Sequence, residues 1–344
     1  MITTKKGETT LYMNITILAK QEMARLLSMR EAIEGDKEAL ALYSSGKSAI
    51  PLRTNLTIQK YEGQSLYMPG YAEDAHALGI KIVSVYPHNS EKKLSTVPAA
   101  IVLLNAETGE IKSLMDGTFL TQLRTGAVAG AATDLLARKA SSVFALIGTG
   151  GQAEKQLEAV LAVRPITKVR IYSPNQAHAA EFTARMRSLF AGTYPAVMTA
   201  VSTPDEAIDN ADIITAITTS KTPVFDGKKV KQGAHVNGIG SYMPDMQELP
   251  EELLQRASKM YLDTREGVLH EAGDFIKPIQ AGRFSEKRIT GELGDLVLGN
   301  VPGRESAEEI TVFKSTGSAI LDIVIAEKIY ACAAAQRAGT VITL

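Results

Sequence analysis

The sequence predicts an α/β protein with a doubly wound parallel sheet and a second, split domain of the α+β type. Three observations lead to this prediction. An apolar segment at residues 143–147 runs directly into a glycine-rich turn and then into a helix-forming segment. From residue 141 onward, apolar strand segments alternate with helical segments, the pattern of a parallel sheet covered by helices. Before residue 115, strand segments follow one another without helices between them, which favours an antiparallel sheet.

Length and composition fit two globular domains and exclude several classes of protein. The chain has 344 residues, of which 45% are hydrophobic and 22% charged, and its net charge is −1. This balance gives no broad attraction to nucleic acid or to a membrane surface. No apolar stretch reaches the roughly 18 residues of a membrane span, and Lys5 and Lys6 are not followed by a signal-peptide core. The single cysteine, Cys332, forms no intrachain disulfide. We therefore expect a cytoplasmic protein without nucleic-acid or membrane partners.

The first 115 residues predict one helix and a meander of strands. The helix covers residues 20–40. The strands are expected at residues 66–68, 79–86, 99–104 and 111–115. A Pro-Gly pair at residues 69–70 predicts a turn after the first strand, and a polar segment at residues 105–110 predicts a turn before the last. A long helix rich in Ala and Gly follows at residues 118–138 and is expected to connect the two domains.

The second domain is expected to contain the alternating segments. Its strands are predicted at residues 143–147, 168–172, 197–201, 212–217, 235–239, 260–263 and 310–313. Its helices are predicted at residues 154–163 and 177–189 and, after the N-cap Thr203, from Pro204. A last helix at residues 317–335 is expected to return to the first domain. The predicted domains are thus 1–117 with 317–344, a connecting helix at 118–140, and a nucleotide-binding domain at 141–316.

The turn after residue 147 has the features that a dinucleotide's pyrophosphate requires. Gly148 permits the tight turn, Gly150 lets backbone N–H groups approach the phosphates, and Ala153 keeps the following helix close to the sheet. The helix N-terminus then faces the anion. We therefore predict a Rossmann-type domain, with Gly151 and Gln152 of the same turn also among the cofactor-binding residues.

The end of the second strand bears on the choice of nicotinamide cofactor. An acidic residue at this position binds the ribose hydroxyls of NAD and repels the 2′-phosphate of NADP. Here Ser173 occupies the position, Asn175 follows, and no carboxylate occurs before Glu181. Ser173 and Asn175 could donate hydrogen bonds to a phosphate, although no arginine stands beside them. The sequence favours NADP(H), with NAD(H) as the alternative.

The five histidines show no spacing typical of metal ligands, and no Cys-x-x-Cys pair occurs. We predict no metal site.

Several further segments carry a resemblance to a known family. They are residues 116–127 (DGTFLTQLRTGA), 237–245 (NGIGSYMPD), 271–274 (EAGD) and 313–317 (FKSTG). Together with the glycine-rich turn, and in this order along nearly the whole chain, they resemble the ornithine cyclodeaminase/μ-crystallin family. Members of that family bind NAD(P) and act on small α-imino or α-amino acids. The resemblance implies a Rossmann domain, a split domain for substrate binding and dimerisation, and a homodimer.

The resemblance also implies a set of substrate-binding cations. By match to the family, Arg53, Lys81 and Arg124 bind the substrate carboxylate and form the catalytic group. A small carboxylate needs concentrated positive charge, and arginine matches it with two parallel hydrogen bonds. Lys81 stands in an apolar strand, where burial would lower its pKa and allow proton exchange. The proton donor to the imine nitrogen is either Lys81 or an ordered water.

Other family positions are assigned by the same resemblance. Thr96 and Thr125 match threonines near the cofactor, and Thr218 follows a parallel strand where the ribose would pass. Lys314 and Asp322 match positions near the nicotinamide or the domain junction, where a structural role is equally consistent.

Two positions depart from the cyclodeaminase itself. That enzyme uses an Asp where this chain has Tyr242, and a Glu where it has Leu66. Both carboxylates suited to a diamine are therefore missing, which argues against ornithine as the substrate.

The sequence favours NAD(P)H-dependent reduction of a cyclic ketimine, Δ1-pyrroline-2-carboxylate or Δ1-piperideine-2-carboxylate, to L-proline or L-pipecolate. The alternatives are an alanine dehydrogenase-like activity, an ornithine cyclodeaminase with a different base, and a non-catalytic protein that binds a small ligand.

The same residues could also have structural roles without any part in catalysis. Lys81 could extend its amine to solvent, and Arg124 could form a surface ion pair with Asp116 or Asp134. Asp245 and Glu248 could cap a helix near Pro244.

Overall fold

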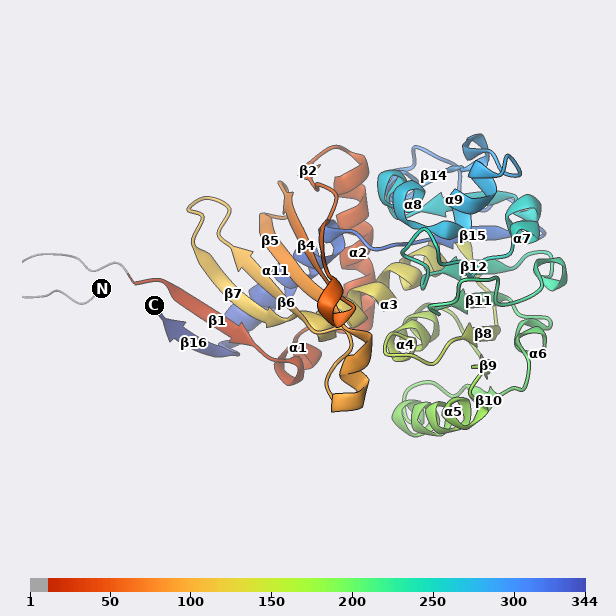
Figure 1. The fold of residues 1–344 in the computed structure, drawn as a ribbon, viewed down its shortest axis with the longest axis horizontal. Helices are drawn as coiled ribbons and strands as arrows, with labels where there is room; N and C mark the ends of the chain where they lie inside the picture. Colours follow the sequence, from red (N-terminus) through yellow and green to blue (C-terminus); the bar gives the residue numbers. More distant parts are fainter. Residues whose placement is uncertain (1–11) are drawn as a thin grey trace, which may run out of the picture. The chain divides into compact units, whose positions relative to one another are not determined.

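The computed structural model describes residues 12–344, which form two compact units (Figure 1). The first unit comprises the described residues up to Ser28, together with Gly46–Thr121 and Ala319–Leu344. The second comprises Met29–Ser45 and Gln122–Ser318. The helix expected to connect the domains is α3 (Gly117–Leu136), which begins in the first unit and runs on in the second.

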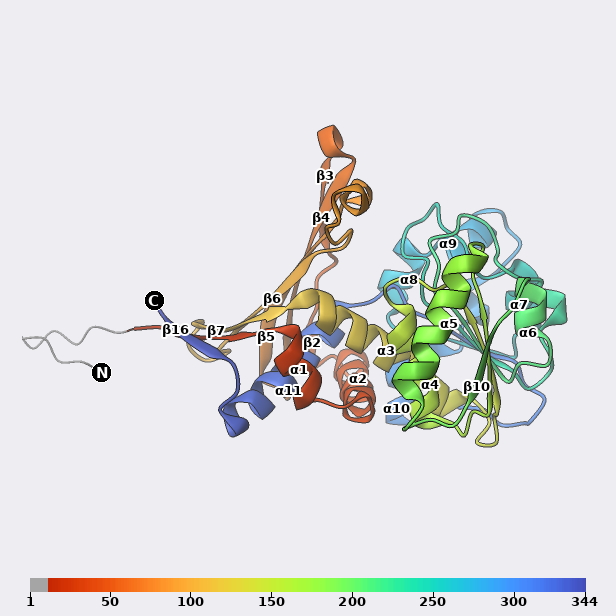
Figure 2. The same cartoon turned by 90° about the horizontal axis from the view of Figure 1, so that it is seen from below.

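A mixed, mostly antiparallel sheet forms the body of the first unit. Its strands lie in the order β16-β1-β7-β6-β5-β4-β2, with β3 also paired to β4. Of the pairs described, only β1 and β7 run parallel. The strands are β1 (Asn14–Leu18), β2 (Ser48–Ala49), β3 (Thr54–Ile58), β4 (Gly63–Ala72), β5 (Ala77–Val85), β6 (Ala99–Leu104), β7 (Ile111–Asp116) and β16 (Thr340–Thr343). Figure 2 shows β3 and the adjoining part of β4 extending as a ribbon from the rest of this sheet.

Helix α11 (Ala319–Gln336) covers one face of this sheet, against β4, β5 and β6. The sheet has little room there, because a Cβ added to Gly70 would lie 2.8 Å from Cδ1 of Ile50 and 3.0 Å from Cδ1 of Ile323. The remaining helical segments of this unit are α1 (Lys20–Leu26), η1 (Gln59–Tyr61) and η2 (Pro87–Lys92).

Two predictions for this part of the chain are wrong. The helix predicted at residues 20–40 is two helices, α1 and α2 (Met29–Ser44), because Leu27 takes an extended conformation and is itself buried. The turn predicted at residues 69–70 lies inside β4. Strand β3 pairs with β4 as far as Tyr67 and β2 begins only at Tyr71, so Pro69 faces no partner strand on that side and its missing N–H costs nothing there.

The second unit contains an eight-stranded sheet whose pairs all run parallel, as predicted. Its order is β10-β9-β8-β11-β12-β15-β13-β14. The strands are β8 (Val143–Ile147), β9 (Lys168–Tyr172), β10 (Val197–Ala200), β11 (Ile213–Ala216), β12 (His235–Gly238), β13 (Lys259–Leu262), β14 (Gly291–Glu292) and β15 (Thr311–Lys314). The direction of winding reverses between β8 and β11, as in a Rossmann-type sheet.

Helices cover both faces of this sheet (Figures 1 and 2). Helices α4 (Ala153–Val163) and α5 (Gln176–Phe190) lie on one face, and α6 (Pro204–Ile208) and α7 (Glu251–Arg256) on the other. Further short helical segments are η3 (Gly227–Lys229), α8 (Arg265–Glu271), α9 (Gly273–Gln280), η4 (Glu286–Arg288) and α10 (Leu293–Leu298). Among the described residues, the chain has no helix with the length and apolar character needed to cross a bilayer.

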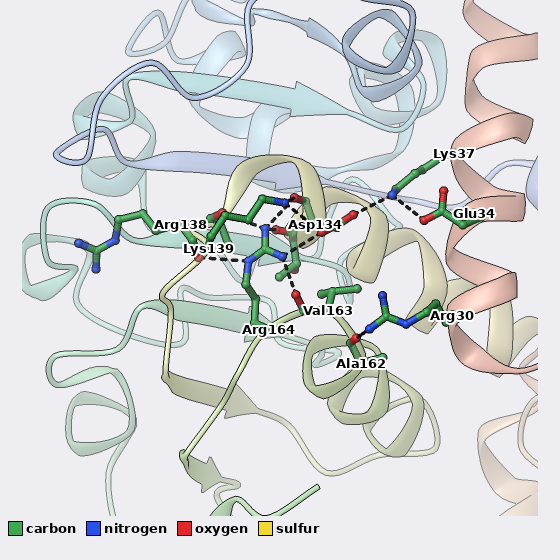
Figure 3. A network of polar contacts seen from close by, with 11 residues as sticks. Arg30, Glu34, Lys37, Asp134, Arg138, Lys139, Ala162, Val163 and Arg164 are labelled. Atoms are coloured by element: carbon green, nitrogen blue, oxygen red, sulfur yellow. Dashed lines mark hydrogen bonds and ion pairs between the residues drawn. The ribbon is translucent and has the colours of Figure 1, made fainter. Parts of the chain in front are cut away.

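A buried arginine fixes the end of α3 within the second unit (Figure 3). Arg164 donates to the backbone carbonyls of Thr133, Asp134 and Ala137 in the last turn of the helix and just beyond it. Lys37 of α2 pairs with the carboxylate of Asp134 at 2.8 Å. Helix α2 is thereby attached to α3 and belongs with the second unit.

Candidate active site

The glycine-rich turn lies where the winding of the parallel sheet reverses. Gly148 follows β8 with φ of +108°, and a Cβ there would overlap the carbonyl oxygen of Ile217, after β11. The two strands therefore approach too closely for any residue but glycine. In doubly wound folds this is the point at which dinucleotides bind.

The rest of the turn leaves space beside the N-terminus of α4. A Cβ added to Gly150 would meet no atom within 4 Å, and one added to Gly151 would lie 3.7 Å from Nε2 of Gln122. Gln152 is the N-cap of α4, and its buried Oε1 has no hydrogen-bond partner among residues 12–344. The space beside Gly150 and Gly151 and the N-terminus of α4 fit a bound pyrophosphate. The unsatisfied Oε1 of Gln152 could accept a hydrogen bond from a ribose hydroxyl.

The predicted ribose-contacting residues follow β9. Ser173 is largely buried, and its carbonyl accepts a hydrogen bond from Gln176 at 3.0 Å. Asn175 is the N-cap of α5, where its Oδ1 accepts from the N–H of His178 at 3.1 Å. The side-chain nitrogen Nδ2 of Asn175 is the atom that could donate a hydrogen bond to the cofactor. No carboxylate stands at the end of this strand.

Arg124 and Thr125 lie on α3, within the second unit. Arg124 is buried, with 5% of its surface exposed, so a solvated surface ion pair is not its role. Its guanidinium lies against Gly317, where a Cβ would come within 2.7 Å of Nη1. The hydroxyl of Thr125 is buried and has no hydrogen-bond partner in the described part of the chain.

Lys81 of the first unit is buried in β5 and forms an ion pair with Asp322 of α11. The Nζ–Oδ2 distance is 2.6 Å, and the two side chains are 2% and 0% exposed. Lys81 therefore does not extend to solvent. The carboxylate of Asp322 attracts the Lys81 ammonium, a partner that the apolar strand around Lys81 did not predict.

Arg53 and Leu66 lie on the same face of the sheet as Lys81. Met68 pairs with Lys81, and extending the β3–β4 register by one residue places Arg53 opposite Met68. Leu66 precedes Met68 by two residues and is also buried on this face. A glutamate at position 66 would thus have stood on the face that carries both cations.

Thr96 lies in the loop between η2 and β6, where its carbonyl accepts from the N–H of Tyr86 at 2.9 Å. Thr218 follows β11, and Tyr242 follows β12.

Three buried carboxylates lie at the carboxyl edge of the parallel sheet, and the sequence did not predict their partners. Glu248 does not cap a helix. It accepts hydrogen bonds from the backbone N–H groups of Thr218, Gly240 and Ser241. Asp274 accepts from the N–H groups of Glu248 and Leu249 at 2.6 and 2.9 Å.

Asp263 binds the loop after β15. It accepts from Oγ of Ser315 at 2.6 Å and from the N–H of Gly317 at 2.8 Å. An acidic residue after an apolar strand was the one sequence feature that could have indicated these carboxylates. Their partners are mainly backbone groups, which the sequence does not identify.

No three His, Cys, Asp or Glu side chains within residues 12–344 are grouped so as to hold a metal ion.

Comparison with known proteins identifies the family. The family model described as "Ornithine cyclodeaminase/mu-crystallin family" matches residues 13–337. A Δ1-pyrroline-2-carboxylate reductase from Bacillus cereus is 39% identical over 323 residues, covering 94% of this chain and 98% of the relative. The Thermococcus litoralis Δ1-pyrroline-2-carboxylate reductase, solved with NADH and L-proline, matches with a TM-score of 0.90 and 39% identity over 95% of this chain and 99% of that one. An archaeal alanine dehydrogenase dimer with bound NAD matches with a TM-score of 0.88 and 35% identity over 96% and 99% of the two chains. The chain belongs to the ornithine cyclodeaminase/mu-crystallin family.

Proposed function

We propose that the chain catalyses NAD(P)H-dependent reduction of a cyclic ketimine carboxylate to the L-amino acid. The substrate would be Δ1-pyrroline-2-carboxylate or Δ1-piperideine-2-carboxylate, and the product L-proline or L-pipecolate. The likeness to two Δ1-pyrroline-2-carboxylate reductases over at least 94% of this chain carries the proposal. The lack of a carboxylate at Leu66 and Tyr242, the two positions suited to a diamine, supports it against ornithine cyclisation.

In the proposed mechanism, Arg53, Lys81 and Arg124 bind the substrate carboxylate and orient the ring. A reduced nicotinamide held by the cofactor-binding residues would supply the hydride for the imine carbon. The iminium charge makes that carbon electrophilic, and fixing its orientation lowers the barrier. A proton must reach the imine nitrogen, and Lys81 or an ordered water provides it. Asp322, 2.6 Å from Lys81, holds the ammonium in place.

The cofactor-binding residues of the proposal are those predicted above. They are Gly148, Gly150, Gly151, Gln152, Ser173, Asn175, Thr96, Thr125 and Thr218. We propose a preference for NADP(H), since no carboxylate at the end of β9 would repel a 2′-phosphate. The solved relatives hold NADH and NAD, so NAD(H) remains the alternative.

We also propose that the enzyme is a homodimer that uses the outer face of the first unit's sheet. Tyr71, Ile82 and Leu114 on this face are 37%, 36% and 39% exposed. Ile82 pairs with Ala100, and Leu114 with Val102, so the apolar side chains are contiguous across neighbouring strands. Large apolar faces of this kind mark association surfaces, and the archaeal relative is a dimer.

A substrate panel assayed with NADPH and NADH tests the reaction. We expect cofactor oxidation with the two cyclic imines, formation of the L-amino acid, and little turnover with pyruvate and ammonia. Faster turnover of pyruvate and ammonia would instead support an alanine dehydrogenase. NAD-dependent release of ammonia from ornithine would support a cyclodeaminase. Tight ligand binding without any turnover would indicate a binding protein.

A further inference from the structure

One buried carboxylate joins two loops at the carboxyl edge of the parallel sheet. Oε1 of Glu248 accepts a hydrogen bond from the N–H of Thr218, which follows β11. Its Oε2 accepts from the N–H groups of Gly240 at 2.5 Å and Ser241 at 2.8 Å, which follow β12. A single side chain therefore fixes the backbone beyond two neighbouring strands.

The two loops also touch directly at Gly240. A Cβ at this position would overlap the backbone nitrogen and oxygen of Thr218 and lie 2.7 Å from Oε1 of Glu248. Glycine permits this approach, and the carboxylate bonds to N–H groups on both sides of it. The loops after β11 and β12 thus pack against each other around Glu248.

A second acid and a lysine hold Glu248 in turn. Asp274 accepts from the N–H of Glu248, and its Oδ2 lies 3.0 Å from Nζ of Lys314, the last residue of β15. All three side chains are fully buried. Burial raises the pKa of Glu248 to about 7, a net shift that the charge of Lys314 opposes and the charge of Asp274 supports.

The position of these loops indicates what they would contact. In a doubly wound fold, the strands on one side of the reversal bind the adenosine half of a dinucleotide, and those on the other side bind the nicotinamide half. Strands β8, β9 and β10 form the first group here, and β11 and β12 begin the second. Glu248 therefore orders backbone on the nicotinamide side.

We propose that Glu248 is a positioning residue that fixes the walls of the nicotinamide subsite by binding the loops after β11 and β12 together. The proposal rests on the nicotinamide cofactor of the proposed function. Glu248 acts through Thr218 and Gly240 rather than by touching the reacting atoms. Loops already held in their binding conformation need not be ordered when the cofactor binds, so affinity for its nicotinamide half is higher.

A pH dependence follows from the hydrogen bonds. An ionised carboxylate accepts from both loops, whereas a protonated one carries an O–H group on one oxygen, which is a weaker acceptor. Because the pKa of the Glu248 carboxyl is raised towards neutrality, its protonated fraction grows as the pH falls from 8 to 6. The nicotinamide side is therefore held more firmly at pH 8.

Binding measurements with two ligands test the proposal without catalysis. NADH occupies both halves of the site, and ADP-ribose lacks the nicotinamide. We expect Glu248→Gln to raise the Kd for NADH about tenfold, the loss of roughly one charge-assisted hydrogen bond, while the Kd for ADP-ribose changes less than about twofold. The wild type should bind NADH more weakly at pH 6 than at pH 8, and the Gln variant should show no such dependence.

Asp212→Asn is the matched control. Asp212 is also a largely buried carboxylate that accepts from backbone N–H groups, those of Ser142 and Val143, but at the start of β8, the opposite edge of the sheet. It should lower the melting temperature and leave the Kd for NADH unchanged.

The outcomes separate the two proposals. Equal losses for NADH and ADP-ribose in Glu248→Gln, or no loss for either, would overturn the positioning role. If the Gln variant does not fold, Glu248→Asp keeps the charge on a shorter side chain and should weaken NADH selectively while retaining the pH dependence. A wild type that binds neither NADH nor NADPH would refute the proposed function instead.

Discussion

Lys81, one of the proposed catalytic residues, forms a buried ion pair with Asp322 in the first unit. Burying two charges costs more than their attraction returns unless the geometry is close, and the 2.6 Å separation meets that condition. Removing one partner leaves the other charge uncompensated. The pair therefore makes the position of the Lys81 ammonium sensitive to Asp322.

We predict that Asp322→Asn lowers stability by about 3 kcal/mol and reduces kcat at least about tenfold, because the ammonium loses the group that holds it. Urea unfolding and steady-state kinetics measure the two effects. The control is Glu327→Gln on the same helix. It breaks the ion pair of Glu327 with Lys112 of β7 and should leave kcat unchanged. A variant of Asp322 with normal kcat and KM would remove this residue from the proposed mechanism.

Ser173 allows a direct test of cofactor choice. We predict that Ser173→Asp lowers kcat/KM for NADPH at least about tenfold more than for NADH, because a carboxylate would face the 2′-phosphate. Kinetics with each cofactor at a fixed imine concentration provide the comparison, and Ser173→Ala separates loss of the hydroxyl from the added charge. Equal losses for both cofactors would mean that the ribose does not lie beside this residue.

At the scale of elements, close packing of two helices supports the proposed pyrophosphate site. A Cβ on Gly126 of α3 would lie 2.5 Å from the carbonyl oxygen of Lys155, in the first turn of α4. The N-terminus of α4 is the end that would face the phosphates. The position of this terminus therefore depends on a residue without a side chain.

We predict that Gly126→Ala lowers stability by about 1–3 kcal/mol, the usual cost of overpacking, and weakens NADH binding by displacing α4. Thermal melting with and without NADH measures both effects. Gly192→Ala, where an added Cβ meets nothing within 4 Å, is the control and should be close to neutral. Unchanged melting and NADH affinity in Gly126→Ala would show that the two helices accommodate a methyl group without cost.

The strands of the parallel sheet were the easiest elements to predict. Strands β8 and β9 match the prediction residue for residue. Strand β8 is a continuous apolar run, and β9 alternates buried apolar residues with more exposed ones. Strands β1 and β16 were not predicted. Strand β16 lies at the edge of its sheet, is exposed along its whole length, and pairs with β1 across more than 320 residues of sequence. Its pairing therefore depends on a strand that is distant in the sequence.

In the candidate site, too, local features could be predicted from the sequence and tertiary contacts could not. The glycine-rich turn has a local sequence pattern, and Gly148 has the positive φ that it requires. The ion pair of Lys81 with Asp322 joins residues more than 200 positions apart, and Glu248 binds backbone N–H groups whose identity carries no sequence signal. Such contacts depend on tertiary structure and could not be read from the chain.

At the scale of the whole molecule, both units are assembled from distant parts of the sequence. Residues 12–28 and 319–344 join one unit, and Met29–Ser45 joins the other. The chain therefore passes between the units more than once. Neither unit corresponds to a continuous segment that could be excised and expected to fold alone.

The proposed dimer gives a prediction at this scale. Ile82→Lys places a charge on the apolar outer face of the first unit's sheet and should convert the dimer to a monomer, measured by analytical ultracentrifugation. Leu189→Lys, at an exposed apolar position on α5 of the second unit, is the control and should remain dimeric. A wild type that sediments as a monomer, or an Ile82 variant that stays dimeric, would contradict the assignment of this face.

The central claim is that positive side chains bind the carboxylate of a cyclic imine and thereby orient it for reduction. The most direct measurement compares kcat/KM for Δ1-pyrroline-2-carboxylate with that for Δ1-pyrroline, the same ring without the carboxylate, in the wild type and in Arg124→Ala. We predict at least about a hundredfold preference for the carboxylate in the wild type, and its near loss in the variant, since a bidentate arginine contact contributes several kcal/mol. Equal reduction of the two rings by the wild type would contradict the account.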